Sequence, residues 1–222
     1  MPSAASTDIR QKGYIIRTYR LSETSLIVEW LTESEGRVPT VAKGALRKKS
    51  NYAGKLDVFF LANMSYRPSQ RSDLHQLKEV ELLSTPSKIR RSLKRLNQVA
   101  YFVDLIRRTT ETCTPLEEVF QLFHQSIRVS EEQYRGSWFT LWFEWQLLGI
   151  LGLQLPLQSS GLPNDERQIL EAWSTGSGVD YEHNSSSVGE IASFLGHSWA
   201  QELGKNLPLR SQVLSDGVRT LT

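Results

Sequence analysis

The chain has 222 residues, 39% hydrophobic and 23% charged, with a formal net charge of +2, which is the composition of an ordinary soluble protein of one or two domains. A single cysteine, Cys113, excludes an intramolecular disulfide, and no apolar run approaches the ~20 residues of a membrane span. The polar N-terminus lacks the apolar core of a secretion signal, so the cytoplasm is the expected location.

The charges are divided unevenly along the chain. Residues 1–110 hold 20 Lys/Arg and 10 Asp/Glu, a net +10, whereas residues 111–222 hold 6 and 14, a net −8. A basic half favours polyanions, because each cation that neutralises a phosphate releases a counterion. The asymmetry suggests two surfaces with different partners. The alternative is that the two halves attract each other within one monomer.

Residues 1–12 are expected to be a disordered lead-in, and strands follow it. Apolar residues alternate in the second strand, where Leu26, Val28 and Trp30 share one face. The predicted strands cover residues 13–20, 25–31, 37–43, 56–66 and 74–83. Short strands without a long helix between them predict a small closed barrel over residues 13–84, because closure removes exposed edges. A five-stranded barrel that binds oligonucleotides is the OB-fold, although periodicity alone does not exclude an SH3-like barrel.

The most basic stretch of the chain, residues 37–55, contains no acid. Gly44 ends the third strand, and the loop after it holds one aromatic residue, Tyr52. Cations beside an aromatic suit single-stranded nucleic acid, because the cations meet phosphates and the ring offers a stacking face. A solvated loop with surplus lysine is the alternative. The candidate DNA-binding residues here are Arg37, Lys43, Arg47, Lys48, Lys49, Tyr52 and Lys55.

At Thr85-Pro86 the hydrophobic period changes to that of a helix, and a helical domain is predicted over residues 85–210. Thr85 suits an N-cap and Pro86 the first helical position, and the apolar face continues to Ile106. Cations crowd the first half of this helix, against the preference of the helix dipole. They indicate either an extension of the basic surface or a solvated face. The DNA-binding candidates among them are Arg90, Arg91, Lys94 and Arg95.

Further helices are predicted from Thr114-Pro115 to Ile127 and over residues 134–148, 165–173 and 188–203. The helix at 134–148 is apolar nearly all round, so it is expected to be the centre of the helical domain. Its tryptophans indicate core packing and not a cofactor site. Residues 155–187 are rich in loops, and residues 211–222 are expected to be frayed.

Motifs for chemistry are missing from the sequence. No Gly-x-x-x-x-Gly-Lys-Ser/Thr motif is present, and no Gly-x-Gly-x-x-Gly follows a strand. The four histidines are scattered, and Cys113 has no histidine near it in sequence. We therefore expect no metal site, no cofactor and no small-molecule substrate, and a binding protein is favoured over an enzyme. An enzyme that acts on nucleic acid is the alternative.

Four blocks of sequence, in their spacing, resemble the N-terminal domain of the bacterial recombination mediator family RecO: residues 13–18, 23–28, 32–37 and 42–50. Residues 142–153 resemble the central helix of that family. Residues 194–211 resemble its C-terminal helix and its closing basic-serine signature. The likeness covers nearly the whole chain from Gly13 and is weakest over residues 155–187.

The resemblance implies an α+β chain with an N-terminal OB-fold followed by a helical domain. It implies a non-enzymatic, nucleoid-associated protein that binds single- and double-stranded DNA, anneals complementary strands, contacts the single-strand-binding protein SSB, and with RecR helps to load RecA onto SSB-coated strands. Many members carry a four-cysteine zinc module, but this chain has no cysteine from Thr114 onward and resembles the zinc-free branch. The alternative is an adaptor for SSB or RecR with little DNA affinity.

The resemblance also leads us to expect a docking site for the SSB tail, a short acidic peptide that ends in an apolar residue and a free carboxylate. Such a tail needs an apolar pocket with cations at its rim. Arginine suits the rim best because its guanidinium can hold a carboxylate by two bonds. The candidates are Arg128 and Arg135, with Phe123, Ile127, Trp138 and Trp142 as the apolar wall. Alternatively, the two arginines only pair with Glu131, Glu132 or Glu144.

Overall fold

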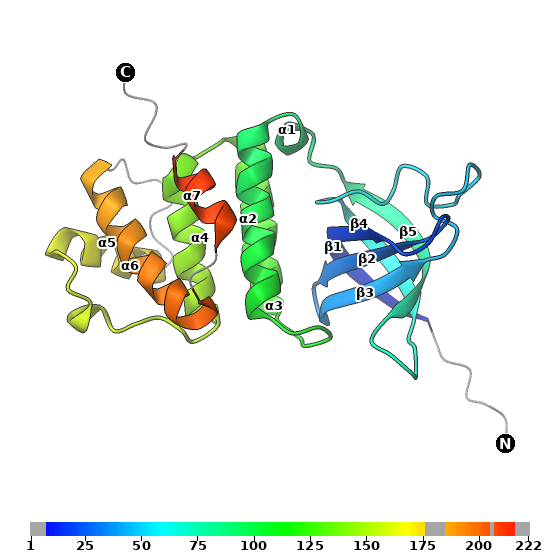
Figure 1. Cartoon of the computed structure of the whole chain (residues 1–222), viewed down its shortest axis with the longest axis horizontal. Helices are drawn as coiled ribbons and strands as arrows, with labels where there is room; N and C mark the ends of the chain where they lie inside the picture. Colours follow the sequence, from blue (N-terminus) through cyan, green and yellow to red (C-terminus); the bar gives the residue numbers. More distant parts are fainter. Residues whose placement is uncertain (1–7, 176–184, 205–206, 216–222) are drawn as a thin grey trace. The chain divides into compact units, whose positions relative to one another are not determined.

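The computed structural model describes residues 8–175, 185–204 and 207–215, which form two compact units (Figure 1). The barrel unit comprises Met1–Ser87 and Thr110–Gln121, and the helical unit comprises Lys88–Thr109 and Leu122–Thr222. The sequence predicted a boundary near residue 84 but not the return of residues 110–121 to the barrel unit. The described helices include none that is long and apolar enough to cross a membrane.

The barrel unit is built from β1 (Ile9–Arg20), β2 (Leu26–Thr32), β3 (Gly36–Ala42), β4 (Leu61–Arg67) and β5 (His75–Ser84). These strands close in the order β1-β2-β3-β5-β4, with β1 pairing antiparallel with both β2 and β4. The β3–β5 pair is parallel, whereas β4 and β5 are antiparallel. A five-stranded mixed barrel with this order is the OB-fold, which confirms the predicted fold class.

The barrel core comes from the inward side chains of the alternating strands. Val28 and Trp30 on β2 face Val38 and Thr40 on β3, and all four are fully buried. The indole N–H of Trp30 donates to Thr40 Oγ1 at 3.0 Å, so the polar edge of this large ring is satisfied inside the barrel. Alternation in β2 was therefore a sound guide to which residues enter the core.

The segment 110–121 crosses the outside of the barrel beside β3. The backbone N–H of Cys113 donates to the carbonyl of Arg37 at 2.7 Å. Gly36 has a φ of +65°, and a Cβ there would lie 1.9 Å from the carbonyl oxygen of Thr114. Only glycine therefore fits between the β2–β3 turn and this segment.

The helical unit contains α2 (Leu93–Thr109), α4 (Gly136–Ile150), α5 (Asn164–Ser174), α6 (Ser185–Leu203), α7 (Pro208–Ser215) and a short 3-10 turn, η1 (Leu157–Ser159). The helix α1 (Ser87–Arg90) begins at the boundary between the units, and α3 (Glu117–Glu132) has its first turn in the barrel unit. Helix α4 contacts α2, α5, α6 and α7, and ten of its fifteen residues are buried. It is the central helix that its composition predicted.

Several element boundaries differ from the sequence predictions; for example, β4 begins at Leu61 and not at residue 56, and α3 continues to Glu132 and not only to Ile127. Strand β1 begins at Ile9, so residues 9–12 belong to the barrel and not to a disordered lead-in, because they pair with residues 63–66 of β4. Residues 1–7 lie outside the described residues. Residues 211–215 belong to α7 and are not frayed, because Val213 is buried and Ser137 Oγ donates to the carbonyl of Leu214 at 2.8 Å. Residues 216–222 lie outside the described residues.

A further difference divides the helix that was predicted to begin at Pro86. It is two helices, α1 and α2, separated at Arg91 and Ser92. The carboxylate of Glu131 on α3 accepts from the backbone N–H groups of Lys88 (2.7 Å) and Ile89 (2.9 Å), which satisfies the start of α1. Ser92 then opens α2 in a position that favours serine.

Candidate nucleic-acid interface

The loop between β3 and β4 is a series of tight turns held by backbone hydrogen bonds. The carbonyls of Ala42, Gly44, Arg47, Ser50 and Tyr52 each accept from the backbone N–H three residues later. Two further bonds attach the loop to the β1–β2 turn, from Leu46 N–H to the carbonyl of Thr24 (2.9 Å) and from Gly44 N–H to Ser25 Oγ (3.3 Å). The backbone of the basic loop is thus ordered.

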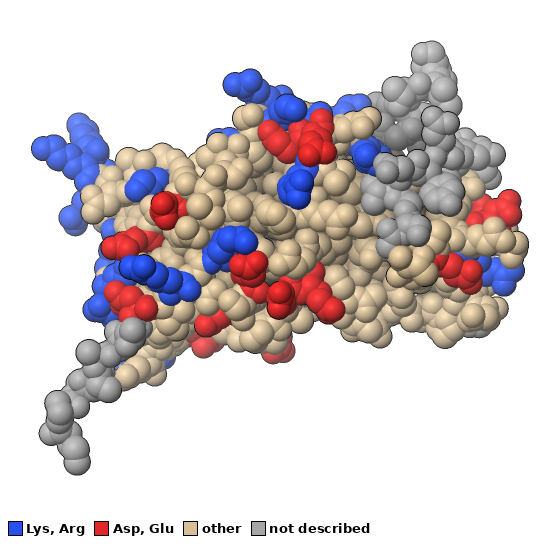
Figure 2. All heavy atoms as spheres, turned by 180° about the vertical axis from the view of Figure 1, so that it is seen from behind, with Lys and Arg blue, Asp and Glu red and all other residues tan. Residues whose placement is uncertain are grey.

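Four of the predicted DNA-binding cations are exposed on this loop: Lys43, Arg47, Lys48 and Lys49. None of them forms an ion pair with another of the described residues. Figure 2 shows Lys and Arg side chains protruding from the end of the barrel where Figure 1 draws this loop. We call these four residues the basic loop cations. They are charged groups on a fixed backbone without a partner in the described chain.

Arg37, in contrast, is not available to a phosphate, which corrects its assignment to the interface. Its side chain is buried, and its guanidinium pairs with Glu29 of β2. Its remaining N–H groups donate to Thr110, to Oγ1 at 2.9 Å and to the carbonyl at 2.6 Å. Arg37 therefore neutralises Glu29 and attaches the segment 110–121 to the barrel.

Tyr52 and Lys55 also take structural roles that the sequence did not indicate. The Tyr52 ring packs against the barrel core, and its hydroxyl lies 3.0 Å from the carbonyl of Leu77 and 3.1 Å from that of Lys78. Burial, and secondarily Glu79, raises the pKa of Tyr52. Lys55 Nζ donates to the carbonyl of Val80 at 3.2 Å. Both side chains fasten the loop to β5, so the Tyr52 ring is not the exposed stacking face that was predicted.

The cations around the α1–α2 break divide in the same way. Arg95 donates to the carbonyls of Ser130 (2.7 Å) and Glu131 (2.9 Å) and thereby caps the end of α3. Arg90, Arg91 and Lys94 are exposed, and Leu93, their neighbour in sequence, is 70% exposed. They form a basic surface on the helical unit, whereas Arg95 has a structural role.

The structure removes most of the wall predicted for the SSB tail. Phe123, Ile127 and Trp142 are buried in the core of the helical unit. Trp138 packs edge-on against Trp173, with ring centroids 4.7 Å apart. Arg128 is exposed and Arg135 is half-buried, but the apolar side chains that should lie between them are already used by the fold. The apolar side chains of a strongly amphipathic or apolar helix usually pack into the core. Here core packing occupies the side chains that were predicted to form the pocket.

An outer row of side chains on the barrel was missed by the sequence reasoning. Tyr19 on β1 pairs with Ile27 on β2, which pairs with Val41 on β3. All three are half-buried, and Arg17 lies over the Tyr19 ring at 4.5 Å from its centroid. We call Tyr19, Ile27 and Val41 the outer row. Simple alternation in β1 would place Tyr19 inside with Ile15, but the register shifts between Ile15 and Arg17 and turns Tyr19 outward.

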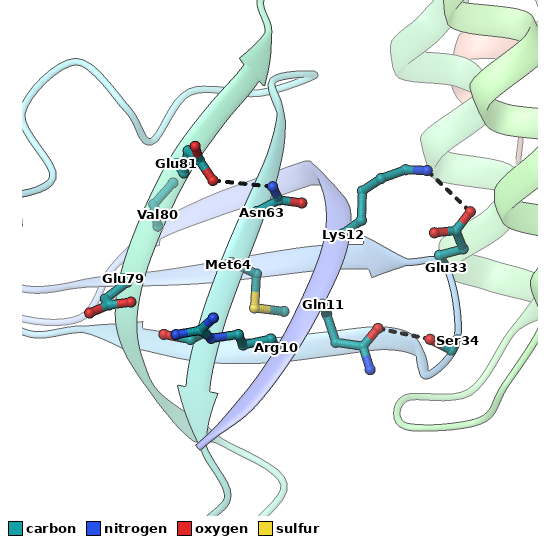
Figure 3. A pocket seen from close by; sticks show the side chains of 11 residues that line it. Arg10, Gln11, Lys12, Glu33, Ser34, Asn63, Met64, Glu79, Val80 and Glu81 are labelled. Carbon is teal, nitrogen blue, oxygen red and sulfur yellow. Dashed lines mark hydrogen bonds and ion pairs between the residues drawn. The ribbon is translucent and has the colours of Figure 1, made fainter.

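A hollow of about 650 Å³ opens on the β1, β4 and β5 side of the barrel (Figure 3). Its cations are opposed by carboxylates, since Lys12 pairs with Glu33 at 3.1 Å, and Glu79 and Glu81 line the other wall. Asn63 Nδ2 donates to Glu81 at 3.2 Å. Three carboxylates in one hollow repel phosphates, so this side of the barrel does not suit nucleic acid.

The described residues contain no group of three or more His, Cys, Asp and Glu side chains able to hold a metal ion. Cys113 Sγ lies 3.8 Å from Nε2 of His75, so the two residues that are distant in sequence are close in the fold. Burial, followed by Asp73 and Glu35, raises the pKa of the Cys113 thiol. A raised pKa lowers the fraction of the thiol that is ionised to thiolate, and the thiolate is the nucleophilic form.

Comparison with known proteins identifies related chains. Residues 6–86 match the family model described as Recombination protein O N terminal, and residues 90–189 match the model described as Recombination protein O C terminal. The DNA repair protein RecO of Idiomarina loihiensis is 32% identical over 142 residues, which are 64% of this chain and 60% of the relative. That of Actinobacillus succinogenes is 34% identical over 163 residues, 70% of this chain and 65% of the relative.

A third relative, the DNA repair protein RecO of Syntrophus aciditrophicus, is 24% identical over 143 residues, 64% of this chain and 55% of the relative. The chain thus spans 55% to 65% of the length of these three relatives. The two matched models follow one another along the chain and together take in both the barrel and most of the helices. The chain therefore belongs to the RecO family of DNA repair and recombination proteins.

Proposed function

We propose that this protein is a DNA-binding recombination mediator that binds single and double strands through its barrel and is not an enzyme. The observation that carries the proposal is the set of basic loop cations, Lys43, Arg47, Lys48 and Lys49. They are exposed, have no acidic partner among the described residues, and lie on a loop whose backbone is hydrogen-bonded to the β1–β2 turn. Phosphates are the groups that such a surface binds most strongly.

The finer parts of the proposal come from family membership. We infer that the protein anneals complementary strands and, with RecR, loads RecA onto SSB-coated single strands in the bacterial cytoplasm, where it is associated with the nucleoid. We further infer that it is of the zinc-free type. Binding of the SSB tail belongs to this proposal without an assigned docking place, since three residues of the predicted apolar wall are buried.

The direct test replaces Arg47, Lys48 and Lys49 with alanine and measures the affinity for a labelled oligonucleotide across several salt concentrations. The affinity should fall to a similar extent for every sequence. The slope of log affinity against log salt should flatten by about 0.7 for each phosphate of a single strand that the variant no longer neutralises. A matched control exchanges the same positions while keeping the charge, as Arg47→Lys, Lys48→Arg and Lys49→Arg, and should keep the wild-type slope.

An unchanged slope in a folded triple-alanine variant would remove these residues from the interface. A wild-type protein with no measurable affinity at moderate salt would instead favour the adaptor function, in which the protein joins SSB and RecR without holding DNA itself. Retention on immobilised RecR or SSB, in the absence of DNA, would then be the measurement that supports it.

A further inference from the structure

We propose that the outer row, with Arg17, is a base-stacking surface that makes the barrel bind single strands more tightly than duplexes. The proposal rests on the DNA-binding function above and assigns a second part to the same interface. The basic loop cations would hold phosphates of either form of DNA, whereas the outer row would be used only by unpaired bases. The preference between the two forms would therefore come from the barrel wall and not from the loop.

The outer row lies next to the basic loop in the register of the sheet. Lys43, the first of the basic loop cations, is exposed directly after the end of β3 and two residues after Val41. Leu21, directly after the end of β1, is 48% exposed. Leu46 of the loop is 44% exposed, and its backbone N–H is bonded to the β1–β2 turn. Exposed apolar side chains and the basic loop cations thus lie at the same end of β1, β2 and β3, where Arg20, Leu26 and Ala42 pair.

The charges on this face suit a phosphate backbone. Glu29, which lies between Arg17 and Pro39 in the next row of the sheet, would repel phosphates if it were free. It is buried and paired with Arg37, and the Tyr19 hydroxyl donates to its Oε2 at 3.4 Å. Arg37 therefore contributes to the interface indirectly, because it neutralises the Glu29 carboxylate.

The Arg17–Tyr19 pair supplies the stacking surface. A guanidinium over a ring presents a flat cationic plane, and bases stack on aromatic rings and on arginine planes alike. Ile27 and Val41 extend this plane with aliphatic surface across the neighbouring strands. In a duplex the base faces are covered by their neighbours, so only the edges and phosphates can reach the barrel. The outer row can then add nothing to the affinity.

The test compares Tyr19→Phe, Tyr19→Leu and Tyr19→Ala for binding to one oligonucleotide as a single strand, as a duplex, and as a single strand with abasic sites. Tyr19→Phe keeps the ring and should keep the wild-type affinity. Tyr19→Ala should weaken single-strand binding by about 5- to 100-fold and leave duplex binding unchanged. Tyr19→Leu keeps apolar bulk on a half-buried site, so it guards against a misfolded alanine variant and should show the same selective loss.

Arg17→Ala should also reduce single-strand affinity more than duplex affinity, with Arg10→Ala as the matched control. Both arginines are exposed on β1, but Arg10 lines the hollow on the opposite side of the barrel. The abasic strand should bind the wild type and Tyr19→Leu equally, because it lacks the base that would stack on the Tyr19 ring. Equal losses on single strand and duplex, or no loss at all in folded Tyr19 variants, would overturn the inference while leaving phosphate binding intact. Loss of the proposed function would appear differently, as a wild-type protein that binds neither form of DNA.

Discussion

Glu144 of α4 and Arg210 of α7 form a two-bonded ion pair inside the helical unit. The Nε atom of Arg210 lies 2.9 Å from Oε1 of Glu144, and its Nη2 atom lies 3.0 Å from Oε2 of the same carboxylate. Tyr101 donates its hydroxyl to Oε1 at 2.5 Å, and the guanidinium also donates to the carbonyl of Ala192 on α6 at 2.8 Å. The buried Glu144–Arg210 pair thus joins α2, α4, α6 and α7. The two charged residues lie in the two helical segments that resembled the family.

Replacing Arg210 with alanine should destabilise the helical unit by about 3–5 kcal/mol, because it leaves a fully buried carboxylate without its counter-charge. The measurement is chemical denaturation followed by circular dichroism. Arg128→Ala is the control, since that arginine is exposed on α3 and its loss should cost about 0.5 kcal/mol or less. If Arg210→Ala proved no more destabilising than Arg128→Ala, the ion pair would not hold α7 in solution.

Arg37→Ala should destabilise the barrel unit by about 3–5 kcal/mol, since it unpairs the buried Glu29 carboxylate. The salt slope of DNA binding should change only through the freed Glu29 carboxylate, so a variant that combines Arg37→Ala with Glu29→Gln should keep the wild-type slope in its folded fraction. Lys43→Ala is the informative contrast, because Lys43 is exposed at the end of the same strand. It should leave the unfolding free energy unchanged and flatten the slope. A flattened slope for the combined Arg37→Ala and Glu29→Gln variant would restore Arg37 to the interface.

Tyr52→Phe should reduce stability and not DNA affinity. The change removes the hydrogen bond from the hydroxyl to the carbonyls of Leu77 and Lys78, which is worth about 0.5–1.5 kcal/mol. Tyr52→Ala should cost more, because the ring packs against the barrel core. Thermal unfolding and oligonucleotide binding on the same samples separate the two effects. A single-strand-specific loss of affinity in stably folded Tyr52→Ala would show that this ring does stack on bases.

Alkaline pH should destabilise the protein through Tyr101. Burial, followed by Glu144, raises the pKa of Tyr101 well above its ordinary value of 10.0. Unfolding lets the phenol ionise near its ordinary pKa, so the stabilisation is fully present below pH 10 and is lost as the pH rises beyond it. When the denaturation midpoint is measured from pH 8 to pH 11, it should decrease above about pH 10. The decrease should be less steep in Tyr101→Phe. Equal slopes for both proteins would contradict a raised pKa.

Metal removal should leave the fold intact. With Cys113 as the single cysteine and with the described histidines lying apart, a tetrahedral Cys/His zinc site cannot be assembled from the described residues. Treatment with a chelator should therefore leave the melting temperature unchanged, and elemental analysis should find no stoichiometric zinc. Stoichiometric zinc that is lost together with the helical signal would show that this chain holds metal in another way.

Local patterns in the sequence determined much of the architecture. Strand-forming composition, with period-two alternation in the second strand, indicated five strands, although β4 begins five residues later than predicted. The 3.6-residue period located the long helices, because a side chain's direction follows from backbone geometry. The exposed cations of the loop at 43–49 were also visible, since a run of Lys and Arg without acids has no local partner to bury it. Several of these same stretches of sequence also gave the resemblance to the RecO family.

Only the tertiary structure decided which side chains are free to act. Arg37 is bound by Glu29 and by Thr110, which lies 73 residues further along, and Tyr52 by carbonyls 25 and 26 residues away. One shift of register in β1 moved Tyr19 from the core face to the outer face. A buried polar or charged side chain is costly unless it has a hydrogen-bond or ionic partner. Which partner is available depends on which distant strands close the barrel. Periodicity carries no information on such long-range pairs, so the sequence indicated a basic loop but not the wall beside it.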